Sequence, residues 1–226
     1  MRRALFISHE ADVAPGYIGD AAAARGFRVE RCDVWRDGAA GVLPPPEDYD
    51  LVVPLGSAAA AYDDDVPWLA GELDLLRRAD RAGVPVFGIC FGAQALARAL
   101  GGTVAPADRP EVGWYTIDSA APELVAPGPW LEWHFDTLTP PEGAAVLARS
   151  PSGVQAYQHG RNLGVQFHPE VSPGILAAWI AGDGGRLRDL GDDTAALLHE
   201  TRRRAARAGA AAHVLFDRVL ARLDLA

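Results

Sequence analysis

The chain has 226 residues, of which 49% are hydrophobic and 23% are charged. This composition is typical of a globular protein and excludes an intrinsically disordered chain, which could not bury enough apolar surface to offset its ordering entropy. The formal net charge of −9 opposes non-specific attraction to phosphate backbones, so we expect no nucleic-acid partner.

Short apolar segments rich in β-formers alternate with Ala- and Leu-rich segments over the first hundred residues. This alternation predicts an α/β fold, a three-layer sandwich in which helices cover both faces of a mostly parallel central sheet. Continuous apolar strands also fit a sheet that is buried on both sides. We expect strands at residues 4–8, 27–33, 51–53 and 84–89, and helices at 18–25, 68–81 and 94–100.

The rhythm changes after Thr103, where the chain becomes rich in Pro and Gly. Strand-like pieces in this stretch predict a small antiparallel excursion before the chain rejoins the sheet. We expect these pieces at residues 114–117, 146–149, 154–157 and 163–167.

The sequence is helical from Pro173 onward and carries an apolar stripe that ends in Val219, Leu220 and Leu223. We favour packing of this stripe on the same domain over a partner surface, because most apolar helix faces serve the core. We therefore expect a single domain, 1–226, with a core of residues 1–182 and a C-terminal helical extension of residues 183–226.

The two cysteines and the hydropathy pattern indicate a reducing setting. Cys32 and Cys90 are too few for a secreted disulfide framework. The apolar stretch Ala4–Ser8 is too short for a signal peptide, and no apolar run reaches the length of a membrane span. We expect a cytoplasmic protein with no membrane partner.

The informative segment is Val84–Gln94, in which an apolar strand ends at Gly-Ile-Cys-Phe-Gly and a helix begins at once. This pattern predicts a nucleophile elbow that carries Cys90, with Gly88 and Gly92 in place because side chains would clash in so sharp a turn. The helix N-terminus favours a thiolate, and the backbone N–H of Phe91 is free to hold an oxyanion.

A base for this thiol is expected in Gly164–Glu170, read Gly-Val-Gln-Phe-His-Pro-Glu. A strand delivers His168 at its C-terminal end, and Glu170 follows two residues later on the same side of an extended chain. Nucleophile, base and orienting carboxylate make a catalytic triad of Cys90, His168 and Glu170. The simpler alternative is a core cysteine and a structural histidine, and we disfavour it because the three features occur together.

These segments resemble the class I glutamine amidotransferase domain with a Cys-His-Glu triad, and most of all the glutaminase domain of GMP synthetases and its stand-alone relatives. The resemblance rests on both segments, on Pro54-Leu-Gly-Ser57 and Leu100-Gly-Gly102, and more weakly on Trp133-His-Phe-Asp136 with Leu147-Ala-Arg-Ser150. It covers residues 50–175 well.

The resemblance implies a role for each matching residue. Cys90 would be the nucleophile, His168 the general base and acid, and Glu170 the group that orients it. The backbone N–H groups of Gly56 and Phe91 would form the oxyanion hole. The remaining matches, expected to contact the substrate, are Gln94, His134, Phe135 and Asp136.

The resemblance further implies hydrolysis of a γ-glutamyl amide through a thioester. The amine could be ammonia, passed to a synthase subunit on another chain, because this chain has no phosphate-binding Gly-x-x-x-x-Gly-Lys loop. It could instead be a larger amine released by a free-standing γ-glutamyl hydrolase or peptidase, or the domain could be an inactive regulatory module. The small-molecule substrate is thus glutamine or another γ-glutamyl compound. No metal or other cofactor is expected, since no His/Cys metal-ligand spacing is found in the sequence.

Overall fold

The computed structural model describes residues 1–37, 43–182, 187, 191 and 193–226. Their main feature is an eight-stranded sheet with the order β2-β1-β3-β4-β10-β9-β8-β6. Strands β1 to β4 and β10 run parallel, and β9, β8 and β6 continue the sheet antiparallel. The strands are β1 (Arg2–Ser8), β2 (Phe27–Asp33), β3 (Leu51–Pro54), β4 (Val86–Ile89), β6 (Asp118–Ser119), β8 (Ala145–Ser150), β9 (Gly153–His159) and β10 (Asn162–Val165).

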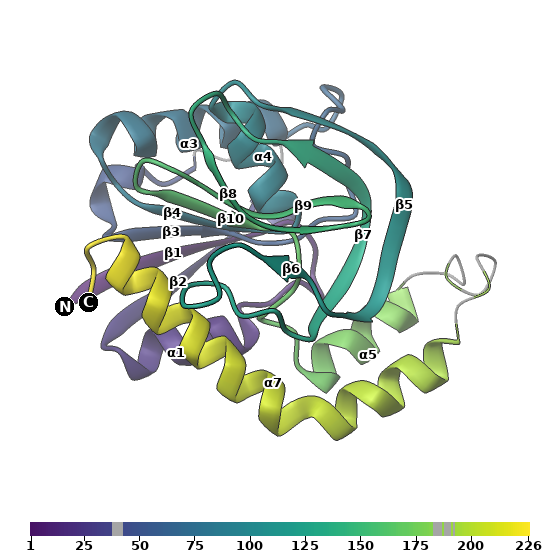
Figure 1. Ribbon diagram of the computed structural model, residues 1–226. Coiled ribbons are helices and arrows are strands. Elements are labelled where there is room, and N and C mark those ends of the chain that lie inside the picture. The colour runs from purple at the N-terminus through teal and green to yellow at the C-terminus, as the bar shows by residue number, and fades with distance from the viewer. Residues whose placement is uncertain (38–42, 183–186, 188–190, 192) are drawn as a thin grey trace.

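Helices cover both faces of this sheet, and this confirms the predicted three-layer α/β fold (Figure 1). Helices α3 and α4 lie on one face, and α1 and α7 lie on the other. The alternation of side chains along β1 feeds both layers: Phe6 joins the core beneath α1 and α7, whereas Ile7 joins the core beneath α3 and α4. The helices are α1 (Gly16–Ala24), α2 (Val34–Asp37), α3 (Leu69–Ala82), α4 (Phe91–Ala99), α5 (Pro173–Gly182) and α7 (Thr194–Arg222), with a 3-10 turn at Pro46–Asp48.

A second, two-stranded antiparallel sheet is formed by β5 (Thr103–Tyr115) and β7 (Trp130–Thr139), which arch beside the main sheet (Figure 1). The sequence predicted only residues 114–117 of this pair, and the strand in fact ends at Tyr115. Pro106 and Pro110 are typical of a loop, so no strand was predicted for the rest of β5. Each strand of a two-stranded sheet is an edge strand, and an edge strand tolerates proline because it need not donate every hydrogen bond of the ladder. Strands β8 and β9 belong to the main sheet rather than to a separate excursion.

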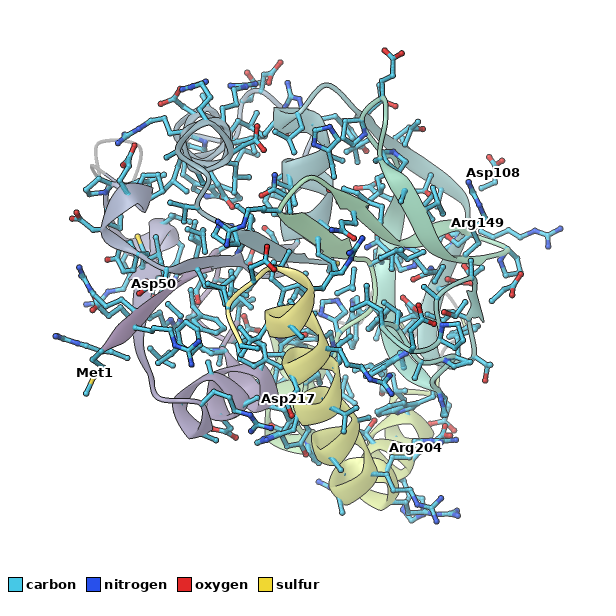
Figure 2. The ribbon with its side chains drawn as sticks, turned by 60° about the vertical axis from the view of Figure 1, so that its left-hand side comes forward. Met1, Asp50, Asp108, Arg149, Arg204 and Asp217 are labelled. Atoms are coloured by element: carbon cyan, nitrogen blue, oxygen red, sulfur yellow. The ribbon has the colours of Figure 1, made fainter. Side chains whose placement is uncertain are left out.

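Helix α7 packs across α1 and α5, and the two chain termini lie side by side (Figure 1). Asp217, which Figure 2 shows on α7, forms an ion pair with Arg25 at the end of α1. The predicted boundary between core and extension, at residues 182 and 183, falls next to residues 183–186, 188–190 and 192, which lie outside the described residues. Among the described helices, none combines the length and the apolar character that crossing a bilayer requires.

Candidate active site

Cys90 occupies the sharp turn between β4 and α4. Its φ of 52° and ψ of −111° lie outside the regions that side-chain-bearing residues normally adopt. The turn brings its neighbours against strand β3, since a Cβ on Gly92 would lie 2.0 Å from the carbonyl oxygen of Pro54. The predicted elbow is therefore present, and the strained backbone presents the thiol at the carboxyl end of β4.

His168 reaches the same place because β10 is the parallel neighbour of β4 in the sheet. The two strands end level with each other, with Val165 opposite Ile89, and the N–H of Cys90 donates to the Val165 carbonyl at 2.8 Å. Strand β10 stops at Val165, two residues earlier than predicted, and the N–H of His168 donates to Leu131 of β7 at 2.8 Å.

Glu170 lies where the spacing predicted, with its Oε1 atom 2.7 Å from Nδ1 of His168. The contact is buried, since the exposed fractions of the two side chains are 3% and 1%. Burial alone would lower the pKa of His168, but the Glu170 carboxylate and the nearby Cys90 sulfur raise it well above its ordinary value. Because a carboxylate oxygen accepts, Nδ1–H of His168 donates in the contact with Glu170.

Gly56 lies directly over the histidine. A Cβ at this position would come within 3.0 Å of Cε1 of His168 and 4.0 Å of Cβ of Cys90. The close approach explains why a glycine follows β3 here. The other proposed oxyanion donor, the N–H of Phe91, belongs to the first residue of α4 and so has no partner within that helix.

Sequence reasoning missed two buried residues that hold this region in place. His9, just after β1, contacts the Gly56 carbonyl with Nδ1 and Glu72 of α3 with Nε2, each at 2.8 Å. Burial would lower the pKa of His9, but Glu72 raises it above its ordinary value. No motif marks His9, because its partners come from distant segments of the chain.

Gln166 is the second such residue. Its amide nitrogen donates to Sγ of Cys90 at 3.5 Å, and its amide oxygen accepts from Nε2 of Gln94 at 3.1 Å. Gln94 thus reaches the site as predicted, although its described partners are protein groups. The sequence could have indicated Gln166, because it stands two residues before His168 on the same extended segment and its side chain therefore points to the same side.

A cavity of about 520 Å³ lies at Cys90 and is lined by most of the predicted site residues. Gln94 and the segment His134–Asp136 line it together with Cys90 and His168. Glu170 and Phe91 are not among the lining residues. Residues that the sequence did not predict also line it: Glu10, Asp12, Val13, Ser57, Ala58, Ala59, Ala60, Tyr62, Trp133, Trp179 and Gly182.

The ring nitrogens of His134 contact groups of the strands β5 and β7. Its Nδ1 donates to the Asp136 carbonyl at 2.9 Å, and its Nε2 faces Glu111 at 3.3 Å and Glu132 at 3.4 Å. Burial would lower the pKa of His134, but its contacts with these two glutamates raise it to about 10. Burial raises the pKa of Glu132. No His/Cys spacing in the sequence marks this cluster, because two of its members are glutamates.

Comparisons with known proteins agree with one another. Residues 48–180, more than half of the chain, match the family described as glutamine amidotransferase class-I. The GMP synthase of Mycolicibacterium paratuberculosis is 46% identical over 51% of this chain, and a glutamine-hydrolysing GMP synthase subunit of Sulfolobus acidocaldarius is 33% identical over 48%. A glutamine amidotransferase structure from Thermotoga maritima superposes with a TM-score of 0.86 at 26% identity, covering 97% of this chain and 98% of that one.

The extent of these matches differs between relatives. The aligned region covers 22% of the M. paratuberculosis GMP synthase but 68% of the S. acidocaldarius protein. The similarity to the longer enzyme is therefore confined to a part of it.

Proposed function

We propose a glutaminase function from one premise, that the chain belongs to the class-I glutamine amidotransferase family. In this proposal the enzyme hydrolyses the γ-amide of glutamine and passes ammonia to a synthase on a separate chain. The observation that carries it is the convergence of Cys90, His168 and Glu170, with 2.7 Å between the histidine and the carboxylate. The match to one separate subunit of a GMP synthase supports a synthase partner.

The proposed reaction begins when the Cys90 thiolate attacks the γ-carbonyl carbon. The N–H groups of Gly56 and Phe91 hold the oxyanion that forms. His168 donates its Nε2 proton to the leaving nitrogen, the C–N bond breaks, and ammonia and a γ-glutamyl thioester result. A water molecule then attacks the thioester while His168 takes its proton, and the C–S bond breaks to release glutamate and the thiolate.

Residues around the triad hold the reacting groups in place. Glu170 keeps Nδ1 of His168 protonated and so directs Nε2 toward the sulfur. Gln166 donates to Sγ, which favours the thiolate. His9 holds the carbonyl of Gly56, and so helps to fix the residue whose own N–H, in the preceding peptide unit, is assigned to the oxyanion hole. We assign substrate contacts to Gln94 and to the segment His134–Asp136, which line the cavity.

The test is an assay of the purified full chain with glutamine that measures glutamate and ammonia separately. We expect both products in equal amounts, and a loss of at least about 1,000-fold in kcat for Cys90→Ser. Cys32→Ser is the matched control and should keep full activity. A wild-type chain that forms no covalent adduct with a glutamine-analogue electrophile would contradict the proposal and favour an inactive module.

The size of the cavity supports a second candidate, a free-standing γ-glutamyl hydrolase. A volume of about 520 Å³ lies in the range of about 300–1,000 Å³ that encloses drug-sized ligands. Glutamine is smaller than such ligands, so a γ-glutamyl peptide or amine would also fit. Faster turnover of γ-glutamyl dipeptides than of glutamine would establish this candidate. Inert dipeptides, with glutamine turnover that rises when a synthase is added, would establish the first.

A further inference from the structure

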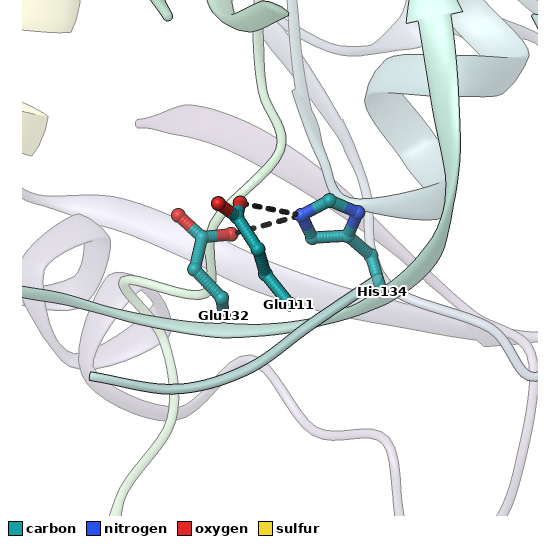
Figure 3. Close-up of side chains that lie close together, drawn as sticks. All are labelled: Glu111, Glu132 and His134. Carbon is teal, nitrogen blue, oxygen red and sulfur yellow. Dashed lines mark hydrogen bonds and ion pairs between the residues drawn. The ribbon is translucent and has the colours of Figure 1, made fainter. Parts of the chain in front are cut away.

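The side chains of Glu111, Glu132 and His134 form a cluster beside the proposed catalytic site, and none of them makes or breaks a bond in the proposed reaction (Figure 3). The register of β5 and β7 creates it. Glu111 stands directly opposite His134, and Glu132 precedes His134 by two residues on the same strand face. Figure 3 shows both carboxylates turned toward the same edge of the imidazole ring.

Two glutamates share a single histidine in this cluster. All three side chains are buried. No arginine forms an ion pair with either glutamate within the described part of the chain. A buried net charge is costly unless it is paired or coordinates a metal ion.

Glu132 makes the strongest case for a missing ligand. Its exposed fraction is 0%, and neither of its carboxylate oxygens has a hydrogen-bond partner among the described residues. It forms an ion pair with Nε2 of His134 at 3.4 Å. Glu111 differs, because its Oε2 atom accepts from Ser150 and Gln155, each at 2.9 Å.

From this geometry we propose that Glu111, Glu132 and His134 bind a divalent transition-metal ion, with Zn²⁺ as the best fit. Bonds of about 2.0–2.2 Å to zinc in tetrahedral geometry place neighbouring ligand atoms about 3.3–3.6 Å apart. Nε2 of His134 lies 3.3 Å from Oε2 of Glu111 and 3.4 Å from Oε2 of Glu132. The cation takes the place of the Nε2 proton, which leaves to solvent, and the charges then sum to zero.

The surroundings supply what such a site requires beyond its three ligands. Nδ1 of His134 donates to the Asp136 carbonyl, which fixes the ring and leaves Nε2 to face the ion. Gln155 offers a fourth ligand, since its terminal nitrogen lies 3.5 Å from Nε2 of His134 and its oxygen lacks a partner among the described residues. Rotation of this amide by half a turn would point the oxygen inward.

The consequence of this site is structural. The ion would join β5 to β7 immediately before Phe135 and Asp136, which line the cavity. It would therefore hold one wall of the proposed active site without touching the reacting atoms.

The test measures metal binding in a chain that carries Cys90→Ser, because the thiol would itself capture zinc. After removal of metal with a chelator, this protein is titrated with Zn²⁺ by calorimetry, and its metal content is measured after gel filtration. We expect one Zn²⁺ per chain and a rise in Tm. When Co²⁺ replaces Zn²⁺, we expect the visible absorption that is typical of a four-coordinate, tetrahedral site.

Glu132→Gln, added to Cys90→Ser, should weaken Zn²⁺ binding by at least about 100-fold, and Glu142→Gln on the exposed surface should leave it unchanged. If Glu132→Gln does not fold, Glu111→Gln takes its place. The proposal is overturned if the parent protein binds no zinc, or if the glutamate variants bind it as tightly as the parent. Neither result bears on the glutaminase proposal, because the assay contains no substrate.

Discussion

The backbone conformation of Cys90 lowers the stability of the fold, but the proposed reaction needs the side chain at this position. A positive φ at a residue with a Cβ costs about 1–3 kcal/mol, and Cys90 is one of two such non-glycine residues in the described chain. Glycine would relieve this strain but would remove the sulfur. The elbow therefore keeps a strained side chain at the place where the proposed reaction needs it.

We predict that Cys90→Gly is more stable than Cys90→Ala by about 1 kcal/mol, because only alanine keeps the Cβ and with it the strain. At most other positions the alanine variant is the more stable of the two. Cys32 lies within β2 and provides the control, where alanine should be the more stable replacement. Urea unfolding of the four variants measures the differences. A Cys90→Ala protein that is more stable than Cys90→Gly would show that the elbow stores no strain.

The charge of Glu170 should set the pH range of the reaction. Its carboxylate raises the pKa of His168, so the proton that the leaving nitrogen needs is retained to higher pH. Glu170→Gln keeps the shape of the side chain and removes the charge. We predict that the alkaline limb of the kcat/KM profile moves down by about 1–3 pH units. A limb that stays in place would mean that another group supplies the proton.

At the scale of elements, His9 joins the end of β1 to helix α3 through Glu72 and contacts the carbonyl of Gly56. Both side chains are fully buried, so water does not screen the interaction between them. The free energy that this pair contributes to folding therefore depends on the charge of His9. The pKa of His9 is raised in the folded protein. Its contribution to stability is therefore complete below the unfolded pKa of about 6.5 and is lost as pH rises through the folded pKa.

We predict that the free energy of unfolding of His9→Gln differs most from that of the wild type below about pH 6.5. Above this pH the difference should shrink by up to about 1.4 kcal/mol per pH unit. Urea unfolding at pH 6 to 9 measures it, and Glu72→Gln should flatten the wild-type profile in the same way. A difference that is constant with pH would show that only the packing of His9 matters.

Local patterns predicted the elements whose residues signal their own conformation. Strand β2 was expected at residues 27–33 and has those bounds, and α3 was expected at 68–81 and spans 69–82. Apolar runs and terminal glycines suffice for such elements. Strands β5 and β7 were largely missed, because they are defined by pairing with each other across an intervening segment and carry proline and polar side chains.

The candidate site divides in the same way. Cys90, His168 and Glu170 could be predicted because each stands in a local motif, and the sheet order then brings the motifs together. Their chemical roles stay predictions. His9 and the glutamates near His134 could not be found, because their partners depend on strand register and helix packing that a linear pattern does not contain.

At the scale of the whole molecule, α7 supplies one side of the core. Four side chains of α7 and that of Leu223, which caps its C-terminus, are buried in the cluster that also contains residues of β1, β3 and α1: Leu215, Phe216, Val219, Leu220 and Leu223. Burying five such side chains stabilises the fold by on the order of 10 kcal/mol, which is comparable to the total stability of a typical domain. We therefore propose that residues 183–226 belong to the same folding unit as residues 1–182.

This proposal predicts that a chain truncated after Gly182 does not fold, because the apolar face of α1 would be exposed to water. The truncated protein should be insoluble or lack a cooperative unfolding transition. Within the full chain, Phe216→Ala should lower the free energy of unfolding by about 3–5 kcal/mol, since Phe216 is fully buried. Val214→Ala is the matched control on the same helix, and its effect should be small because Val214 is 47% exposed. A soluble 1–182 fragment with a cooperative transition would instead show that α7 is an appendage whose apolar face is available to a partner.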